Sequence, residues 1–243
     1  MFARRIASVG RLWMESGDAM NERPLVGILL ITYKRTDLAV LTIRGVKQHL
    51  SYPDLIWHIA DDGSQPGHVE TLLREIDRDD TSLTDARRAG VGKSMNLGMD
   101  ILLARGAEYI LWLEDDWQLV FPFDLAPVVG LMQEREDIGM VRLGYLSPSI
   151  SAQMISAAGQ LWWHLKRNGE TYIFAGHASL RSRSFCLAYG HYVEGLAPGE
   201  TELFMCGRFN GVKGPDIAVP AWIGSWGAFA HIGTDTLKDV RPG

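Results

Sequence analysis

The chain has 243 residues, of which 47% are hydrophobic and 22% charged, and its formal net charge is −5. This composition is ordinary for one globular domain, with or without an appendage, and the negative charge argues against a broad nucleic-acid-binding surface. Its two cysteines, Cys186 and Cys206, form neither a metal-type spacing nor a disulfide framework, so a reducing, cytoplasmic location is expected.

The sequence carries no pattern of a membrane span, and its N-terminal region carries no pattern of a secretory signal. The longest aliphatic run, residues 25–32, is far shorter than the ~20 residues that a spanning helix needs. Residues 1–14 mix three arginines with scattered apolar residues and lack a continuous apolar core. We therefore expect an arm or leader over residues 1–23 and a single domain over residues 24–243.

Strands and helices alternate through the first 146 residues. The apolar run 25–32 predicts a strand buried on both faces, and an amphipathic helix is predicted from Thr36 or Asp37 to Leu50. The next predicted elements, in chain order, are a strand at 55–60, a helix at 68–76, a weak strand at 82–84, a helix at 94–104, a strand at 109–113, a helix at 123–136 and a strand at 138–143. This alternation indicates a mostly parallel sheet with helices on both faces.

The pattern changes after about Leu146. Gly, Ser, Trp and His become frequent, and residues 147–174 are typical of irregular structure or a hairpin. A short helix is predicted at 185–194 and a late strand at 217–223.

The most informative segment is the run from Tyr109 to Trp117, in which a short apolar strand ends in three adjacent carboxylates, Glu114, Asp115 and Asp116. Adjacent acids repel one another unless a cation neutralises them. Mg²⁺ and Mn²⁺ take oxygen ligands, usually one or two carboxylates together with substrate phosphates. The run therefore predicts a metal site that holds a nucleotide diphosphate. An acidic turn that caps the next helix is the alternative.

Two further polar clusters follow predicted strands. Residues 32–35 (Thr-Tyr-Lys-Arg) come after the first strand, and residues 61–64 (Asp-Asp-Gly-Ser) after the second. Each is also an ordinary turn sequence. Ligands of open α/β sheets bind outside the carboxyl ends of the strands, so we expect all three clusters to converge at one edge of the sheet.

These motifs resemble those of the family 2 glycosyltransferases and their relatives with the GT-A fold. The matching segments, which fit in order and spacing over roughly residues 24–146, are Thr32-Tyr33-x-Arg35, the cluster 61–64, the glycine-containing stretch 90–98 and a Glu-Asp-Asp version of the Asp-x-Asp motif. The resemblance implies an α/β fold of GT-A type, with a mostly parallel nucleotide-binding sheet over residues 24–146 and a smaller acceptor-binding part over residues 147–243.

The resemblance also implies a metal-dependent, inverting transfer from a nucleoside diphosphate sugar, with a UDP-sugar favoured, to an acceptor hydroxyl. Mn²⁺ or Mg²⁺ would be bound by Asp116 and by His231. Asp62 would contact the base, and Lys93 and Asn96 would lie near the diphosphate or the donor sugar. The implied nucleotide-binding residues are Thr32, Tyr33, Arg35, Asp61, Asp62, Lys93, Asn96, Glu114 and Asp115.

The general base has two candidates. One carboxylate suffices to take the proton of an acceptor hydroxyl, and residues 198–203 resemble a degenerate form of the family's Glu-Asp motif. The match places Glu200 at the base position, with Glu202 as its competitor. The two would share a face in an extended segment and diverge in a helical turn. Farther upstream, His177 and residues 181–183 are candidates for contact with the acceptor or a phosphate, and a solvated basic face is the alternative.

Three other classes of protein share some of these sequence features. Gly92-Lys93-Ser94 resembles the end of a P-loop, but that motif requires glycine at position 87, which is arginine here. A nucleotidyltransferase lacks support because no glycine-rich N-terminal loop is present. A sugar-nucleotide-binding or glycan-binding module without catalysis is favoured by the degenerate Glu-Asp motif. The acceptor stays open among a glycan, a lipid-linked saccharide, a protein and a hydroxylated DNA base.

Overall fold

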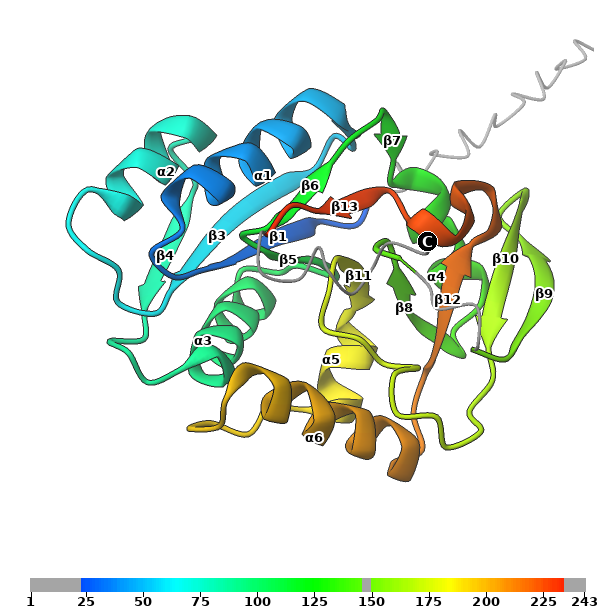
Figure 1. Cartoon of the computed structure of the whole chain (residues 1–243). Coiled ribbons are helices and arrows are strands. Elements are labelled where there is room, and N and C mark those ends of the chain that lie inside the picture. The colour runs from blue at the N-terminus through cyan, green and yellow to red at the C-terminus, as the bar shows by residue number, and fades with distance from the viewer. Residues whose placement is uncertain (1–22, 146–149, 234–243) are drawn as a thin grey trace, which may run out of the picture.

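The computed structural model describes residues 23–145 and 150–233, and the expected N-terminal arm therefore lies outside the described residues except for its last position. The described part is built around a nine-stranded mixed sheet (Figure 1). In sheet order its strands are β4 (Ser82–Asp85), β3 (Leu55–Asp61), β1 (Val26–Thr32), β5 (Tyr109–Glu114), β11 (Ser179–Ser182), β8 (Ile138–Arg142), β12 (Asp216–Pro220), β10 (Gln160–Leu165) and β9 (Ala152–Ala157).

The first half of the sheet is parallel, as the sequence predicts. Every residue of β1 is buried, which explains its continuous apolar run. Thr32 at the end of β1 pairs with Asp61 of β3, and Ile31 pairs with Glu114 of β5. The predicted convergence of the three polar clusters at one edge of the sheet is confirmed by this register.

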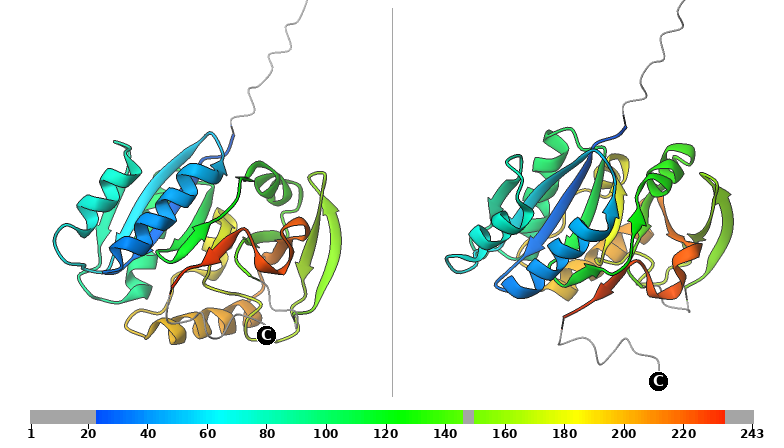
Figure 2. Two further views of the ribbon diagram at one scale, coloured as in Figure 1. Left: turned by 45° about the horizontal axis from the view of Figure 1, so that its top comes forward. Right: turned by 90° about the horizontal axis from the view of Figure 1, so that it is seen from above.

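Helices cover both faces of the sheet (Figure 2). One face carries α1 (Thr36–His49), α2 (His68–Ile76) and α4 (Ala126–Glu134). The other carries α3 (Val91–Ala104), α5 (Arg183–Tyr189) and α6 (Pro198–Gly211). Helix α3 packs closely on β1 at Gly98. Any larger residue would clash there, since a Cβ added at Gly98 would come within 2.3 Å of Leu29 Cδ1. No helix in the described ranges is long and apolar enough to cross a membrane.

The second half of the sheet is mixed. Strand β11 runs antiparallel to both β5 and β8, and the sequence analysis did not predict it. Strands β9 and β10 form a hairpin, which confirms the hairpin alternative for this region. Its turn places Ala158 and Gly159 in the left-handed region, with φ values of 48° and 69°. That conformation suits the twist of a two-residue hairpin turn.

Two small sheets flank the large one. Strand β6 (Trp117–Leu119) pairs with β13 (Phe229–His231), which sets His231 opposite Trp117. Strand β2 (Leu50–Ser51) pairs with β7 (Phe123–Asp124). The β6–β13 pair brings the late histidine back to the acidic run at the end of β5.

Several predicted boundaries were wrong. The helix predicted at 123–136 is the shorter α4, since residues 123–124 belong to β7. The helix predicted at 185–194 is α5, which ends before Gly190. The late strand stops at Pro220 and continues as a 3₁₀ segment, η1 (Ala221–Trp226). Helix α3 begins three residues before the predicted Ser94, and α6 was not predicted.

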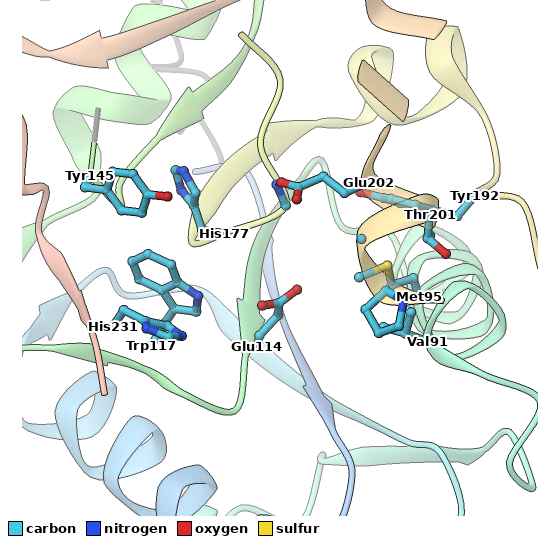
Figure 3. Close-up of a pocket in the computed structure, with 13 residues that line it drawn as sticks. Val91, Met95, Glu114, Trp117, Tyr145, His177, Tyr192, Thr201, Glu202 and His231 are labelled. Atoms are coloured by element: carbon cyan, nitrogen blue, oxygen red, sulfur yellow. The ribbon is translucent and has the colours of Figure 1, made fainter. Parts of the chain in front are cut away.

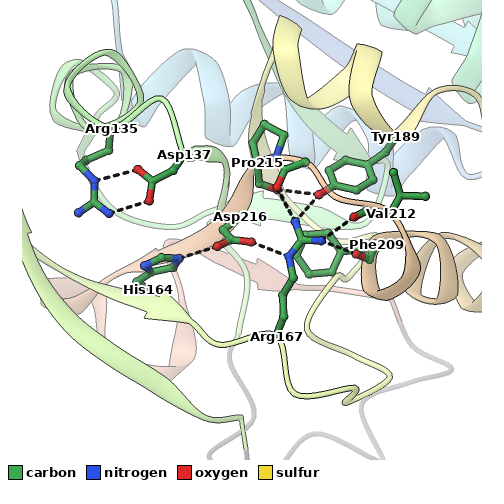
Figure 4. A network of polar contacts seen from close by, with 10 residues as sticks. Arg135, Asp137, His164, Arg167, Tyr189, Phe209, Val212, Pro215 and Asp216 are labelled. Carbon is green, nitrogen blue, oxygen red and sulfur yellow. Dashed lines mark hydrogen bonds and ion pairs between the residues drawn. The ribbon is translucent and has the colours of Figure 1, made fainter.

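A partly buried polar network joins the end of β10 to α6 and β12 (Figure 4). The Arg167 Nε donates to Asp216 Oδ1 at 2.6 Å, and Asp216 Oδ2 lies 3.0 Å from His164 Nε2. The other Arg167 nitrogens donate to the Tyr189 hydroxyl and to four backbone carbonyls, those of Phe209, Val212, Gly214 and Pro215. Arg167 therefore closes the C-terminal end of α6 onto the sheet.

Candidate functional site

Two adjoining cavities open at the carboxyl edge of the parallel strands. The larger, of about 760 Å³, is lined by Ile31, Thr32, Tyr33, Arg35, Leu38, Asp62, Gly90, Val91, Ser94, Glu114, Asp115, Asp116, Leu196, Pro198, His231 and Gly233. The smaller, of about 240 Å³, is lined by Val91, Met95, Glu114, Trp117, Tyr145, Gly176, His177, Tyr192, Pro198, Gly199, Thr201, Glu202 and His231. Four residues, Val91, Glu114, Pro198 and His231, line both and mark the junction between the cavities.

Asp115 is a buried anchor for the loop that follows β1. Its Oδ2 accepts hydrogen bonds from Thr32 Oγ1 at 3.0 Å and from the Tyr33 N–H at 3.2 Å, and its other oxygen pairs with Arg35. Burial raises the pKa of Asp115 to about 6, against the opposing effect of Arg35. These contacts use both carboxylate oxygens, so Asp115 fixes Thr32 and Arg35 in the wall of the larger cavity.

His68 supports the same loop from behind and was not identified from the sequence. Its Nε2 lies 3.0 Å from Thr32 Oγ1, and its Nδ1 lies 2.7 Å from Thr36 Oγ1. Since Thr32 donates to Asp115, it accepts from His68. Burial lowers the pKa of His68, so the neutral ring suits this arrangement.

Asp116 and His231 meet at the junction of the two cavities. Asp116 Oδ2 accepts from Arg35 Nη1 at 2.6 Å and lies 3.2 Å from His231 Nε2. Asp116 Oδ1 is buried and has no hydrogen-bond partner among the described residues. A Cβ at Gly233 would come within 2.7 Å of Asp116 Oδ2, so the chain needs glycine there to pass the carboxylate.

The fit of this pair to a divalent cation is partial. Within residues 23–145 and 150–233, no three His, Cys, Asp or Glu side chains are arranged to hold a metal ion by themselves. Mg²⁺ commonly binds through one or two carboxylates plus substrate phosphates, with waters filling other positions. The unpartnered Oδ1 of Asp116 and the adjacent ring nitrogen of His231 suit a site that a diphosphate completes.

Glu114 lies where the cavities join, facing Glu202. Burial raises the pKa of Glu114 to about 8, and the nearby charges of Asp116, Glu202 and Asp115 add to that shift. A Cβ built at Gly176 would lie 3.4 Å from Glu202 Oε1 and 3.8 Å from Glu114 Oε1. The two carboxyl groups thus approach each other across Gly176 (Figure 3).

The two base candidates diverge because they lie in a helix. Glu202 lines the smaller cavity, and its Oε1 accepts the Gly176 N–H at 2.6 Å. Glu200 is exposed at the start of α6, where its Oε2 accepts the Ala197 N–H at 3.1 Å. Glu200 lines neither cavity. The geometry therefore favours Glu202 over the residue that the motif match preferred.

Three of the expected nucleotide-binding residues have structural partners instead. Asp61 is buried, and its Oδ2 accepts the N–H groups of Gly63 and Ser64 at 3.1 and 2.8 Å. Asn96 holds the backbone N–H and C=O of Tyr192 at 2.8 and 3.0 Å. Lys93 pairs with Glu194 at 3.3 Å. None of the three lines the larger cavity, whereas Asp62 does and accepts the Gly90 N–H at 3.0 Å.

An aromatic wall closes the side of the smaller cavity opposite α6 (Figure 3). Trp117 stacks with Tyr145 at a centroid distance of 6.1 Å, and Tyr145 stacks with His177 at 5.0 Å. His177 Nε2 accepts from Arg142 Nη2 at 2.8 Å, and burial together with Arg142 holds the pKa of His177 well below its usual range. His177 is therefore a neutral, fixed member of the wall.

Trp117 and Tyr145 were missed from the sequence, although Trp117 directly follows the acidic run. The wall is assembled from β6, the segment after β8 and the segment before β11, which lie far apart along the chain. No local pattern brings them together. Eight of the predicted site residues do line the larger cavity: Thr32, Tyr33, Arg35, Asp62, Glu114, Asp115, Asp116 and His231.

Comparison with known proteins identifies the fold. No protein-family model matches the chain, and no curated protein matches its sequence. The structure of S. aureus TarS is similar, with a TM-score of 0.63 at 12% identity over 86% of this chain and 37% of that one. The mannosyltransferase PcManGT from Pyrobaculum calidifontis has a TM-score of 0.53 at 16% identity over 83% of this chain and 58% of its own. GalNAc-T7 has a TM-score of 0.57 at 13% identity, over 82% and 43%.

These similarities confirm the expected α/β fold of GT-A type, with a large sheet flanked by helices. The chain spans between 37% and 58% of the length of these proteins. At such low identity the likeness establishes the fold, and the activity has to be argued from the cavities.

Proposed function

We propose that the chain is a glycosyltransferase that moves a sugar from a nucleoside diphosphate sugar to an acceptor hydroxyl, with inversion at the anomeric carbon. The observation that carries this proposal is the junction of the two cavities. Glu114, Asp116 and His231 line the larger cavity, and Glu202 faces Glu114 from the smaller one. A candidate metal-binding carboxylate and a candidate base thus lie on either side of the junction of the two cavities.

The similar structures support the class of donor. TarS has been solved with UDP-GlcNAc, PcManGT with GDP-Man and Mn²⁺, and GalNAc-T7 with UDP, GalNAc and Mn²⁺. In this chain we assign the nucleoside to the larger cavity, where Tyr33 and Asp62 would contact the base. A UDP-sugar is the favoured donor, as expected from the sequence.

The leaving diphosphate develops negative charge next to the carboxyl groups of Glu114, Asp115 and Asp116. A cation is required to offset this accumulation of negative charge. Asp116 and His231 would hold Mn²⁺ or Mg²⁺, and the bound ion would neutralise phosphate charge as the glycosidic bond breaks. Arg35 is already ion-paired with Asp115 and Asp116, and its charge opposes the effect of burial, which raises the pKa of Asp115.

Glu202 would act as the general base in this proposal. Its Oε1 is held by the Gly176 N–H, which orients the carboxylate in the smaller cavity. The carboxylate takes the proton of the acceptor hydroxyl as the acceptor oxygen bonds to the anomeric carbon and the diphosphate leaves. A single displacement of this kind inverts the anomeric configuration.

A donor screen tests the proposal. The chain is incubated with UDP-, GDP-, dTDP- and CDP-sugars and Mn²⁺, and release of the nucleoside diphosphate is measured. We expect release from one donor class, with loss of activity in Asp116→Asn at unchanged circular dichroism. Binding of a donor without any release, with every acceptor class supplied, would instead indicate a binding module. Neither binding nor release would reject the proposal.

A further inference from the structure

The junction of the two cavities is bounded on one side by the N-termini of two helices. Val91 is the first residue of α3 and Pro198 the first residue of α6, and both line the larger and the smaller cavity. Both helices have 14 residues, long enough for a developed dipole. The partial positive charge at their N-termini therefore faces the passage from one cavity to the other.

The first turn of α3 offers hydrogen-bond donors at this passage. Its N-cap, Gly90, makes no side-chain cap, and the N–H groups of Val91 and Gly92 donate to no other described residue. Amide groups at such an end are open to an anionic ligand.

Ser94 supplies the independent evidence for a ligand. Ser94 is one of the residues that line the larger cavity and is only 1% exposed, yet its buried hydroxyl has no hydrogen-bond partner among the described residues. A buried hydroxyl without a partner is costly, since it forfeits its bonds to water. Its position in the first turn of α3 makes a ligand in this cavity the natural acceptor.

We infer that the diphosphate of the donor lies at the junction, accepting hydrogen bonds from the Ser94 hydroxyl and from the first amides of α3. This inference rests on the proposed function and adds a residue that the sequence analysis did not select. It also replaces Lys93 and Asn96, which were expected near the diphosphate but bind residues 192–194 instead. The nucleoside then occupies the larger cavity, and the sugar extends into the smaller one beside Glu202.

The test separates the phosphate contribution from the rest of the ligand. Calorimetry is first used to find which of UDP, GDP, dTDP and CDP the wild-type protein binds best. That diphosphate and its nucleoside are then titrated into wild type and Ser94→Ala, with Mn²⁺ and separately with EDTA. A hydrogen bond to a charged group contributes about 1.5–3 kcal/mol, which corresponds to a roughly 10-fold to 100-fold loss of affinity. We expect that loss for the diphosphate and no change for the nucleoside.

Thr81→Val is the matched control. The Thr81 hydroxyl is also buried without a partner among the described residues, but it lies before β4, at the amino edge of the parallel strands. Its removal should leave both affinities unchanged. Equal loss of diphosphate and nucleoside affinity in Ser94→Ala, or no loss of either, would overturn the inference while the proposed function stands. Failure of the wild-type protein to bind any of the four diphosphates would overturn both.

Discussion

Replacing Glu202 by glutamine isolates the proposed base from the rest of the site. The amide oxygen of glutamine can still accept the Gly176 N–H that Glu202 Oε1 accepts at 2.6 Å, so the side chain should keep its place. The substitution removes the basic oxygen and one negative charge. Loss of a general base typically costs about 10²–10⁴ in rate, or roughly 3–5 kcal/mol in the activation barrier. We expect kcat for transfer to fall by that factor.

The assay combines nucleotide-release kinetics with calorimetric titration of the donor. Donor affinity should stay nearly constant in Glu202→Gln, because the residue lines the smaller cavity and not the nucleoside site. Glu200→Gln is the matched control: its side chain accepts the Ala197 N–H outside both cavities, and glutamine also suits that capping position. A large loss in Glu200→Gln with full activity in Glu202→Gln would refute the reasoning and return the base to the motif position.

Three further predictions follow from the described contacts. Asp62→Ala should weaken nucleoside diphosphate binding several-fold in calorimetry, because Asp62 lines the larger cavity. Unchanged affinity would mean that the nucleobase of the nucleotide binds elsewhere. Arg167→Met should lower the free energy of unfolding in urea by about 2–4 kcal/mol, since Asp216 and four carbonyls lose a donor. Arg135, which is partly exposed and pairs with the exposed Asp137, is its control, and Arg135→Met should cost less than about 1 kcal/mol. Burial lowers the pKa of His58 to about 4, so the folded state disfavours its protonation. The contribution of neutral His58 to the free energy of unfolding is complete above its ordinary pKa of about 6.5 and falls as the pH drops towards 4. Urea midpoints at pH 7 and pH 5 should therefore differ less in His58→Gln than in wild type.

The local sequence pattern was sufficient to predict the strands of the parallel half of the sheet. A strand such as β1, buried on both faces, leaves a continuous apolar run, and polar residues at its carboxyl end mark the edge where ligands bind. Seven of the eight predicted site residues that line the larger cavity lie at or just after the ends of β1, β3 and β5, because this rule depends on strand direction alone. The eighth, His231, was expected only from the family resemblance. The same rule cannot separate a residue that faces a ligand from one that holds the turn, which is why Asp61 was included.

The smaller cavity could not be predicted in the same way. Strand β11 inserts antiparallel between β5 and β8, a long-range pairing with no local signature. It brings the segment containing His177 beside Trp117. Helix α6 did carry a signal, because Pro198 occupies the first helical position, where proline is favoured. Taking that proline as a helix start would have shown that Glu200 and Glu202 point in different directions.

A crystal structure with a bound donor would show which cavity holds each part of the donor. The protein would be crystallised with Mn²⁺ and the nucleoside diphosphate sugar that it binds best, using Glu202→Gln to prevent turnover. We predict the nucleoside beside Tyr33 and Asp62, the diphosphate at the junction near Asp116 and Ser94, and the sugar next to residue 202. A donor bound outside these two cavities, or one oriented with its sugar in the larger cavity, would contradict this prediction.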